Sequence, residues 1–256
     1  MRMDSNTILI TGGTSGIGFE FAKRLLALGN TVLITGRDEE KLERAKKALP
    51  GIHGFQSDVS DPGSIVKLHQ EVVARFPQLN VLINNAGIMR NLDLNHSSDL
   101  NDVVQEIGIN LSGSIRMAQQ FLSILKVNGP SVIVNVSSGL AFIPFSLSPI
   151  YGATKAGIHS YSQALRKQLE GTNVGVTEVA PPATGTTLMD AFGPGLRSGQ
   201  MSTEKMVDLT LRGLSQGKTE ILPGASRLLK LMSRIAPTFF FHRLSEVFTR
   251  LARRVP

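Results

Sequence analysis

The sequence predicts an α/β domain doubly wound around a parallel sheet, and three observations support this fold class. Short apolar segments rich in β-branched residues recur along the 256 residues, and each precedes a segment of helical periodicity. Strands this short and this apolar are typical of a parallel sheet that helices cover on both faces. No internal repeat or flexible linker divides the chain. We therefore expect one α/β domain.

The first half of the chain alternates strands and helices in a regular order. Thr7–Ile10 is a short apolar strand, and the segment Gly16–Leu28 after it has a helical pattern. Thr31–Thr35 repeats the strand pattern, and the charged segment Asp38–Leu49 is strongly helical. Three further elements are a weaker strand at His53–Gln56, a helix over Pro62–Phe76 and a strand at Val81–Ile83.

The second half continues the alternation and adds an extension. The expected elements are a helix over Leu100–Leu125, a strand at Val132–Val136, a helix over Tyr151–Glu170, a strand at Val174–Val179, a helix over Thr203–Ser215 and a seventh strand at Glu220–Leu222. Residues 1–224 thus form the predicted domain. Residues 225–256 hold two amphipathic helical segments that Pro237 separates, and we expect this extension to be packed on or attached to the domain.

Charge is distributed unevenly between these two regions. The net charge is +7, but residues 225–256 hold seven Lys and Arg residues against Glu246 alone. The first 224 residues are therefore close to neutral, at +1. The chain also lacks Trp, has two Tyr and shows no zinc-finger or base-stacking pattern. We predict no nucleic-acid partner.

Other residue types exclude several further classes. Cysteine is absent, which excludes disulfide scaffolds, thiolate metal sites and cysteine nucleophiles. None of the five histidines stands at a metal-ligand spacing, so we predict no metal. No apolar run approaches the roughly 18 residues that cross a bilayer, and the first residues lack a signal-peptide core. We expect a cytoplasmic protein.

A glycine-rich loop, Thr11–Gly18, joins the first strand to the first helix. In a doubly wound sheet this is where the pyrophosphate of a dinucleotide binds, because glycines permit a tight turn and free N–H groups face the phosphates. The alternative is a glycine turn without a ligand. A phosphate loop of the NTPase type at Gly217-Lys218-Thr219 is excluded, since Arg212 stands where its first glycine is required. The expected cofactor contacts here are Gly12, Thr14, Ser15, Gly16, Ile17 and Gly18.

The end of the second strand bears on the choice of cofactor. An acidic residue at this point would bind the ribose hydroxyls of NAD and repel a 2′-phosphate. The sequence has Gly36-Arg37 instead, and arginine offers a charged fork for a phosphate. We therefore predict NADP in preference to NAD. The alternative is a solvated Arg37 that pairs with Asp38 or Glu39.

Three residues fit the chemistry of a carbonyl/alcohol pair. Tyr151 and Lys155 are four residues apart, so they share one helix face, and a nearby ammonium lowers the pKa of a tyrosine from about 10. A tyrosine activated in this way can act as general acid or base. Ser138, after the fifth strand, could bind the substrate oxygen as charge develops. The alternative is a partly buried Tyr/Lys surface pair.

The chain resembles the single-domain short-chain dehydrogenase/reductases over residues 6–224. The matching features are the Thr11–Gly18 loop, Asp58-Val59, Asn84-Asn85-Ala86-Gly87, Asn110, Ser138, Tyr151 and Lys155, in order and at family spacing. The resemblance implies a Rossmann-like, seven-stranded parallel sheet and hydride transfer between a nicotinamide cofactor and a substrate. Within the family, residues 138–142 and 179–182 look most like the DltE-like bacterial oxidoreductases.

The resemblance also implies individual roles. Tyr151 is the expected acid/base, Lys155 binds the ribose and tunes the tyrosine, and Ser138 positions the substrate oxygen. Asn110 is expected to hold a water of a proton relay. The remaining expected cofactor contacts are Asp58 and Val59 at the adenine, Asn85, Ala86 and Gly87 at the adenosine ribose, and Pro181 and Thr186 at the nicotinamide.

The sequence departs from the family pattern after the sixth strand and at the end of the chain. Pro182 replaces the usual glycine; it fixes φ and removes an N–H, so the loop beside the nicotinamide cannot follow the usual path in detail. Residues 187–202 are rich in apolar residues and glycine, and we interpret them as either a mobile lid over an apolar substrate or an ordinary loop packed on the core.

The extension 225–256 leaves two interpretations open. Its apolar stripes with flanking basic residues suit a peripheral contact with an anionic membrane, at the inner face. Alternatively, its helices cover the mouth of the active site or form a dimer contact. Taken together, the sequence predicts an NADP-preferring oxidoreductase of a small, apolar carbonyl or alcohol, and a homo-oligomer. The rival functions are a non-catalytic dinucleotide-binding protein and a membrane-surface interaction protein.

Overall fold

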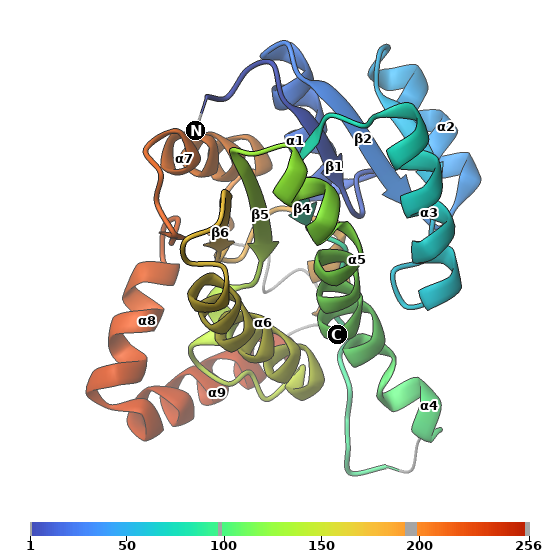
Figure 1. The fold of residues 1–256 in the computed structure, drawn as a ribbon. Coiled ribbons are helices and arrows are strands. Elements are labelled where there is room, and N and C mark those ends of the chain that lie inside the picture. The colour runs from blue at the N-terminus through green and yellow to red at the C-terminus, as the bar shows by residue number, and fades with distance from the viewer. Residues whose placement is uncertain (1, 97–98, 193–198, 254–256) are drawn as a thin grey trace.

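The computed structural model describes residues 2–96, 99–192 and 199–253, and its centre is a seven-stranded parallel sheet (Figure 1). The strand order is β3-β2-β1-β4-β5-β6-β7. The strands are β1 (Thr7–Ile10), β2 (Thr31–Gly36), β3 (His53–Gln56), β4 (Leu79–Asn84), β5 (Ser131–Val136), β6 (Val174–Val179) and β7 (Glu220–Ile221). The predicted fold class is confirmed.

Helices cover both faces of this sheet. The α-helices of the described residues are α1 (Gly16–Ala27), α2 (Glu39–Ala48), α3 (Pro62–Arg75), α4 (Leu100–Val103), α5 (Ser114–Val127), α6 (Pro149–Gln168), α7 (Thr203–Ser215), α8 (Ser226–Ile235) and α9 (Pro237–Arg253). Alternation along β1 explains the two layers, since Ile8 and Ile10 join the apolar cluster of α1 and α7. Leu9 faces the other way and joins the cluster of α3, α5 and α6, in which Phe121 is fully buried. The sheet is therefore buried on both sides.

The strand order reverses between β1 and β4. From β1 the chain moves outward to β2 and β3, then returns across the sheet to β4, where Ile10 pairs with Ile83. In a doubly wound sheet, the loops that leave the strands on either side of such a point diverge and open a crevice at the carboxyl edge. Thr11 directly follows β1, and Asn84 is the last residue of β4. The glycine-rich loop that begins at Thr11 therefore lies at this crevice.

One predicted helix is wrong in detail. The expected continuous helix Leu100–Leu125 is divided into α4, a π-helical segment η1 (Ile107–Gly113) and α5. Gly113 lets this segment approach the loop after β3, because a Cβ at Gly113 would lie 2.9 Å from Cγ2 of Val59. Wider π turns inside helices are frequent at functional sites, and this one carries Asn110.

The extension forms two helices that pack on the domain. Pro237 begins α9, where a missing N–H costs nothing, so the chain bends between α8 and α9 as the sequence predicted (Figure 1). The start of α8 packs on the 3-10 turn η2 (Gly139–Ala141), since a Cβ at Gly139 would lie 2.9 Å from Oγ of Ser226. No described helix is long and apolar enough to cross a membrane.

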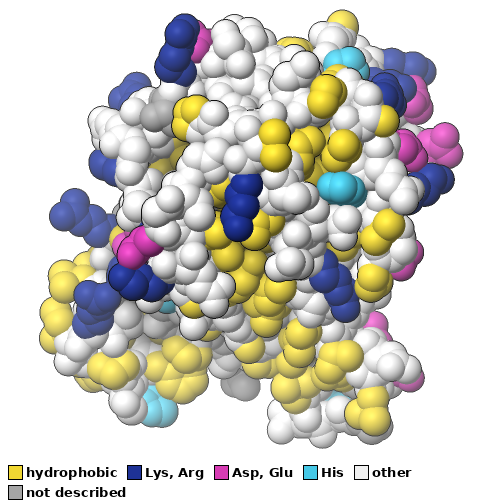
Figure 2. Space-filling model, in the orientation of Figure 1, with side chains coloured by type: hydrophobic (Ala, Val, Ile, Leu, Met, Phe, Trp, Pro, Cys, Tyr) yellow, Lys and Arg dark blue, Asp and Glu magenta, His cyan; other side chains and the backbone are white. Residues whose placement is uncertain are grey.

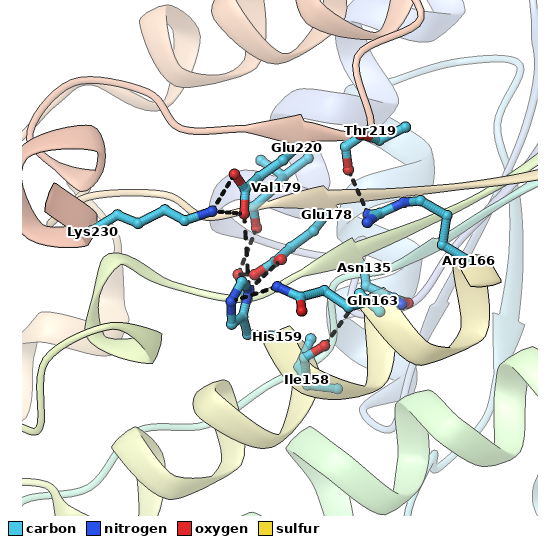
Figure 3. A network of polar contacts seen from close by, with 12 residues as sticks. Asn135, Ile158, His159, Gln163, Arg166, Glu178, Val179, Thr219, Glu220 and Lys230 are labelled. Carbon is cyan, nitrogen blue, oxygen red and sulfur yellow. Dashed lines mark hydrogen bonds and ion pairs between the residues drawn. The ribbon is translucent and has the colours of Figure 1, made fainter. Parts of the chain in front are cut away.

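A partly buried polar network connects α8 to the sheet (Figure 3). Glu178 on β6 accepts a hydrogen bond from Ser137 at 2.5 Å and contacts Nδ1 of His159 at 2.7 Å. Glu220 on β7 lies 4.0 Å from the same Nδ1 and forms an ion pair with Lys230 of α8. His159, Glu178 and Glu220 are close enough to share a metal ion, which the sequence did not indicate. Because Lys230 and Ser137 already contact these carboxylates, we assign the cluster a structural role.

We expect Glu178→Ala to lower the free energy of unfolding by about 2 kcal/mol, because it strips Ser137 and His159 of a buried acceptor. Glu178→Gln should cost less, since its amide oxygen can still accept from Ser137. Urea unfolding measures both. Glu170→Gln, which removes only an exposed ion pair with Lys167, is the control and should stay within about 0.5 kcal/mol. An equally small change in Glu178→Ala would show that the network contributes nothing to stability.

Candidate active site

The glycine-rich loop after β1 takes the turn that the sequence predicted. Gly12 and Gly16 have φ of 65° and 56°, a region that favours glycine. Gly18 has a different purpose: a Cβ there would lie 2.3 Å from the carbonyl oxygen of Gly12, so this glycine lets α1 pack tightly on the loop. Gly18 does not line the cleft, and its assignment as a direct cofactor contact is not supported by this geometry.

The first turn of α1 is suited to an anion. Its N-cap residue Ser15 makes no side-chain capping bond, and the turn has no acidic residue. Asp38, Asp61 and Ser202, by contrast, each accept backbone N–H bonds at the starts of α2, α3 and α7. The uncapped N–H groups of α1 point to a phosphate, because a helix N-terminus carries partial positive charge. A dinucleotide pyrophosphate fits this position.

Thr11 and Asn85 join the glycine-rich loop to the end of β4. The Thr11 hydroxyl accepts hydrogen bonds from the backbone N–H of Asn85 and of Ala86, each at 3.0 Å. The Asn85 amide donates to the carbonyls of Thr11 and Gly12 at 3.0 and 3.1 Å. The Asn85 amide N–H groups are thus engaged in positioning the loop, although the residue also lines the cleft.

The end of the cleft that lies beside the carboxyl end of β2 is polar and charged. Arg37 is half-exposed, and its nearest acidic partner is Asp58, with 3.9 Å between Nη1 and Oδ2. The alternative pairing predicted for Arg37 is not found: Asp38 instead caps α2 and lies 3.7 Å from Lys41. Lys41 also lines the cleft, and the sequence analysis missed this second cation.

Ser138, Tyr151 and Lys155 meet at the other end, at the carboxyl ends of β5 and β6. Tyr151 and Lys155 lie on the first turns of α6, and the Lys155 ammonium is 5.5 Å from the centre of the tyrosine ring. Lys155 donates to the carbonyl of Val136 at 2.8 Å, which anchors it to the end of β5. Ser138 is hydrogen-bonded to the Tyr151 side chain. The three residues therefore form one buried constellation.

Burial sets the protonation of this pair. Desolvation raises the pKa of Tyr151 to about 12, with Glu106 adding to the rise, while the hydrogen bond with Ser138 opposes it. Desolvation also lowers the pKa of Lys155 to about 8. The sequence predicted a lowered tyrosine pKa from the lysine charge. In the structure, desolvation is the largest influence on the pKa of Tyr151 and raises it. The phenol is therefore neutral near neutral pH.

Asn110 braces the loop that follows β4. Its side chain accepts from the N–H of Ile88 and donates to the carbonyl of the same residue, both at 2.8 Å. Its backbone carbonyl accepts from Ser114 at 3.0 Å. Asn110 is fully buried and does not line the cleft. The structure thus places it behind Gly87, in a supporting position, and its expected role in a proton relay stays a prediction.

Apolar side chains surround the tyrosine end. Met89, Phe145, Tyr151 and Phe192 form a buried cluster, and Leu188 packs against it. Phe248 of α9 contacts Phe145 edge-to-face, with ring centres 5.0 Å apart. Leu229 of α8 also lines the cleft. The extension therefore covers part of the site, which is one of the two arrangements that the sequence left open.

The loop after β6 keeps the proline pair close to the cleft. Pro181 accepts from the N–H of Gly139 at 2.8 Å, and Pro182 accepts from the Thr184 hydroxyl at 2.8 Å. Thr186 approaches the glycine-rich loop, since a Cβ at Gly16 would lie 3.3 Å from its methyl group. Of the predicted lid, Thr187–Phe192 form a 3-10 segment, whereas Gly193, Pro194, Gly195 and Leu196 lie outside the described residues.

One cleft of about 710 Å³ connects these parts. The predicted site residues that line it are Gly12, Thr14, Ser15, Gly16, Ile17, Arg37, Asp58, Val59, Asn85, Ala86, Gly87, Ser138, Tyr151, Lys155, Pro181 and Thr186. Lining residues that the sequence analysis missed include Lys41, Met89, Phe145, Leu229 and Phe248. The glycine-rich loop and the buried Tyr151 thus line one continuous cleft.

This arrangement, a glycine-rich loop and a buried tyrosine at the carboxyl edge of a doubly wound sheet, is typical of one class of oxidoreductases. The family model for short chain dehydrogenases matches residues 6–196. A Bacillus subtilis relative, described as an uncharacterized oxidoreductase DltE, is 44% identical over 224 residues, which cover 86% of this chain and 89% of the relative. The chain belongs to the short-chain dehydrogenase/reductase family.

Other relatives and solved structures agree with this placement. An NADP-dependent 3-hydroxy acid dehydrogenase, YdfG of Salmonella typhi, is 33% identical over 70% of this chain and 73% of its own. A short-chain dehydrogenase/reductase of Burkholderia phymatum in complex with NAD superposes with a TM-score of 0.84 at 24% identity, covering 95% and 96% of the two chains. A Burkholderia cenocepacia short-chain dehydrogenase in complex with NADP gives 0.83 at 23% identity, covering 95% and 99%. Both structures share the fold.

Stability should rise with pH above about 8 because of Lys155. The buried lysine loses its proton near pH 8, whereas the unfolded chain keeps it up to about 10.5. Between these two pH values the unfolded state binds more protons than the folded state. The ratio of folded to unfolded protein should therefore rise by up to roughly tenfold per pH unit. Lys155→Met should lack this gain, whereas Lys167→Met, at an exposed site, should keep it. Urea unfolding between about pH 8 and 9, where Tyr151 is almost entirely neutral in both states, is the measurement. Equal pH slopes in wild type and Lys155→Met would contradict the assigned shift.

Proposed function

We propose that this protein is an NADP(H)-dependent oxidoreductase that reduces a small apolar carbonyl compound or oxidises the matching secondary alcohol. The observation that carries the proposal is the buried Ser138/Tyr151/Lys155 constellation at one end of the cleft, with Arg37 and Lys41 at the other. The NADP-dependent YdfG relatives support the same cofactor.

The bound dinucleotide would supply or accept the hydride, and the chain's own residues would handle the proton. Neutral Tyr151 is equipped to donate its proton to a developing alkoxide, because its raised pKa keeps it protonated. The Ser138 hydroxyl lies beside the phenol and can stabilise the same oxygen. Lys155, held by the Val136 carbonyl, places a positive charge beneath the ring. Burial by Phe145 and Phe248 excludes water from the reacting end.

The apolar cluster around Tyr151 supports the substrate class. Met89, Leu188 and Phe192 present no charge to the reacting end, so an apolar carbonyl would fit better than a charged one. The second candidate, a non-catalytic dinucleotide-binding protein, rests on Pro182 alone. Cytoplasmic location and a homo-oligomeric state stay predictions.

Turnover tests the proposal directly. A panel of aliphatic and aromatic ketones is screened with NADPH and with NADH by the loss of nicotinamide absorbance. We expect Tyr151→Phe to lower kcat by at least about a hundredfold while cofactor affinity stays within about twofold, because only the phenolic proton is lost. Tyr161→Phe, further along α6 and outside the cleft, is the matched control and should keep wild-type turnover. Near-normal turnover of Tyr151→Phe would remove this tyrosine from the mechanism.

Cofactor choice is tested separately at Arg37. A charged hydrogen bond to a 2′-phosphate is worth about 1.5–3 kcal/mol, so Arg37→Ala should bind NADP roughly tenfold to hundredfold more weakly and NAD almost unchanged. Substitution at Gly36 is a poorer test, since a Cβ there would lie 2.7 Å from Cγ2 of Thr14. Calorimetric titration of both cofactors measures the difference, with Arg44→Ala, on the same surface but outside the cleft, as the control. Equal losses for NADP and NAD would show that Arg37 does not read the 2′-phosphate.

A further inference from the structure

The outward side of the extension exposes a row of large apolar side chains. Leu228, Leu231, Ile235, Phe239 and Val247 are between 48% and 70% exposed, and we call these five residues the tail face. Leu228, Leu231 and Ile235 follow each other at intervals of three or four residues on α8, and Phe239 and Val247 lie beyond the bend on α9. Such spacing places side chains on one side of a helix, and a monomer rarely leaves so many large apolar groups in water without a binding role.

Arginine side chains flank the tail face. Arg227 and Arg234 are exposed on α8, and Arg243 and Arg250 are exposed on α9. Glu246 is the single acidic residue among residues 225–256. Figure 2 shows this side of the molecule at the lower left, where hydrophobic and basic side chains lie next to each other. Most of the protein's net positive charge thus lies in the same segment as the exposed apolar side chains of the tail face.

The opposite side of the same helices is already occupied. Leu229 and Phe248 line the cleft, and Ser226 is fully buried against η2. Lys230 is tied to Glu220 of β7. The inward contacts hold α8 and α9 on the domain, so the tail face is presented by helices that are already folded. A partner therefore need not supply the free energy that would fold them.

We propose that the tail face binds the surface of an anionic lipid bilayer, with α8 and α9 lying in the headgroup region. Apolar side chains flanked by arginines match the two components of such a surface, acyl chains and negative headgroups. A second copy of this chain matches less well, because a symmetric contact would bring two sets of arginines together with Glu246 as the only counter-charge on each. No described helix can span a bilayer, so the contact is peripheral.

Vesicle sedimentation tests the proposal with the full chain. We expect binding to vesicles that contain phosphatidylglycerol, little binding to pure phosphatidylcholine, and release at high salt. Arg227→Glu with Arg234→Glu removes two attractive charges and adds two repulsive ones, so partition should fall by about tenfold to hundredfold. Leu231→Asp with Ile235→Asp should abolish binding, because charged groups replace the inserted apolar ones.

Matched variants separate this contact from general effects. Arg44→Glu with Lys47→Glu changes the net charge equally on α2 and should retain binding. Leu100→Asp with Val104→Asp alters exposed apolar residues near α4 and should also retain it. Circular dichroism verifies that each variant folds. Failure of the wild type to bind phosphatidylglycerol vesicles at low salt would overturn the proposal. So would light scattering that shows Leu231→Asp with Ile235→Asp dissociating an oligomer while vesicle binding is unchanged, since the face would then be a contact between copies.

Discussion

The hydrogen bonds between Thr11 and Asn85 fix the position of the glycine-rich loop relative to the loop after β4. They connect the loop after β1 to the loop after β4, and these two strands flank the point where the strand order reverses. One loop presents the uncapped N-terminus of α1, and the other leads to Gly87, where a Cβ would lie 3.6 Å from Nζ of Lys155. A cofactor bound along this edge would therefore meet the phosphate end and the reacting end in a fixed spacing.

Burial has opposite effects on the two titratable groups of the reacting end. It favours the neutral forms of both, so the pKa of Tyr151 rises and that of Lys155 falls. The extension contributes to this burial through Phe248, whose ring packs on Phe145. The helices of the extension thus have two distinct sides: an inner side that completes an apolar site and an outer side that we assign to lipid. The ion pair between Lys230 and Glu220 holds α8 in the orientation that separates these two sides.

Much of this arrangement could be predicted from the sequence because it depends on local pattern. Short apolar segments rich in β-branched residues located the strands, and the i, i+4 spacing located Tyr151 and Lys155. The features that were missed depend on contacts between distant elements. The π-helical segment at Ile107–Gly113 accompanies the bonds between Asn110 and Ile88, and the tyrosine pKa depends on how many atoms surround it. The network around Glu178 joins four elements, so no single segment signals it.

The pairing of β1 with β4 also constrains how the chain acquires its structure. Ile10 finds Ile83 only after more than seventy intervening residues have been made, so the centre of the sheet depends on contacts of long sequence separation. Local elements such as α1 and α2 can form transiently at an earlier stage. Until β4 has been made, however, no strand pairs with the second edge of β1. During synthesis the amino-terminal third of the protein would therefore wait, with apolar strand edges exposed, until β4 leaves the ribosome and closes the sheet.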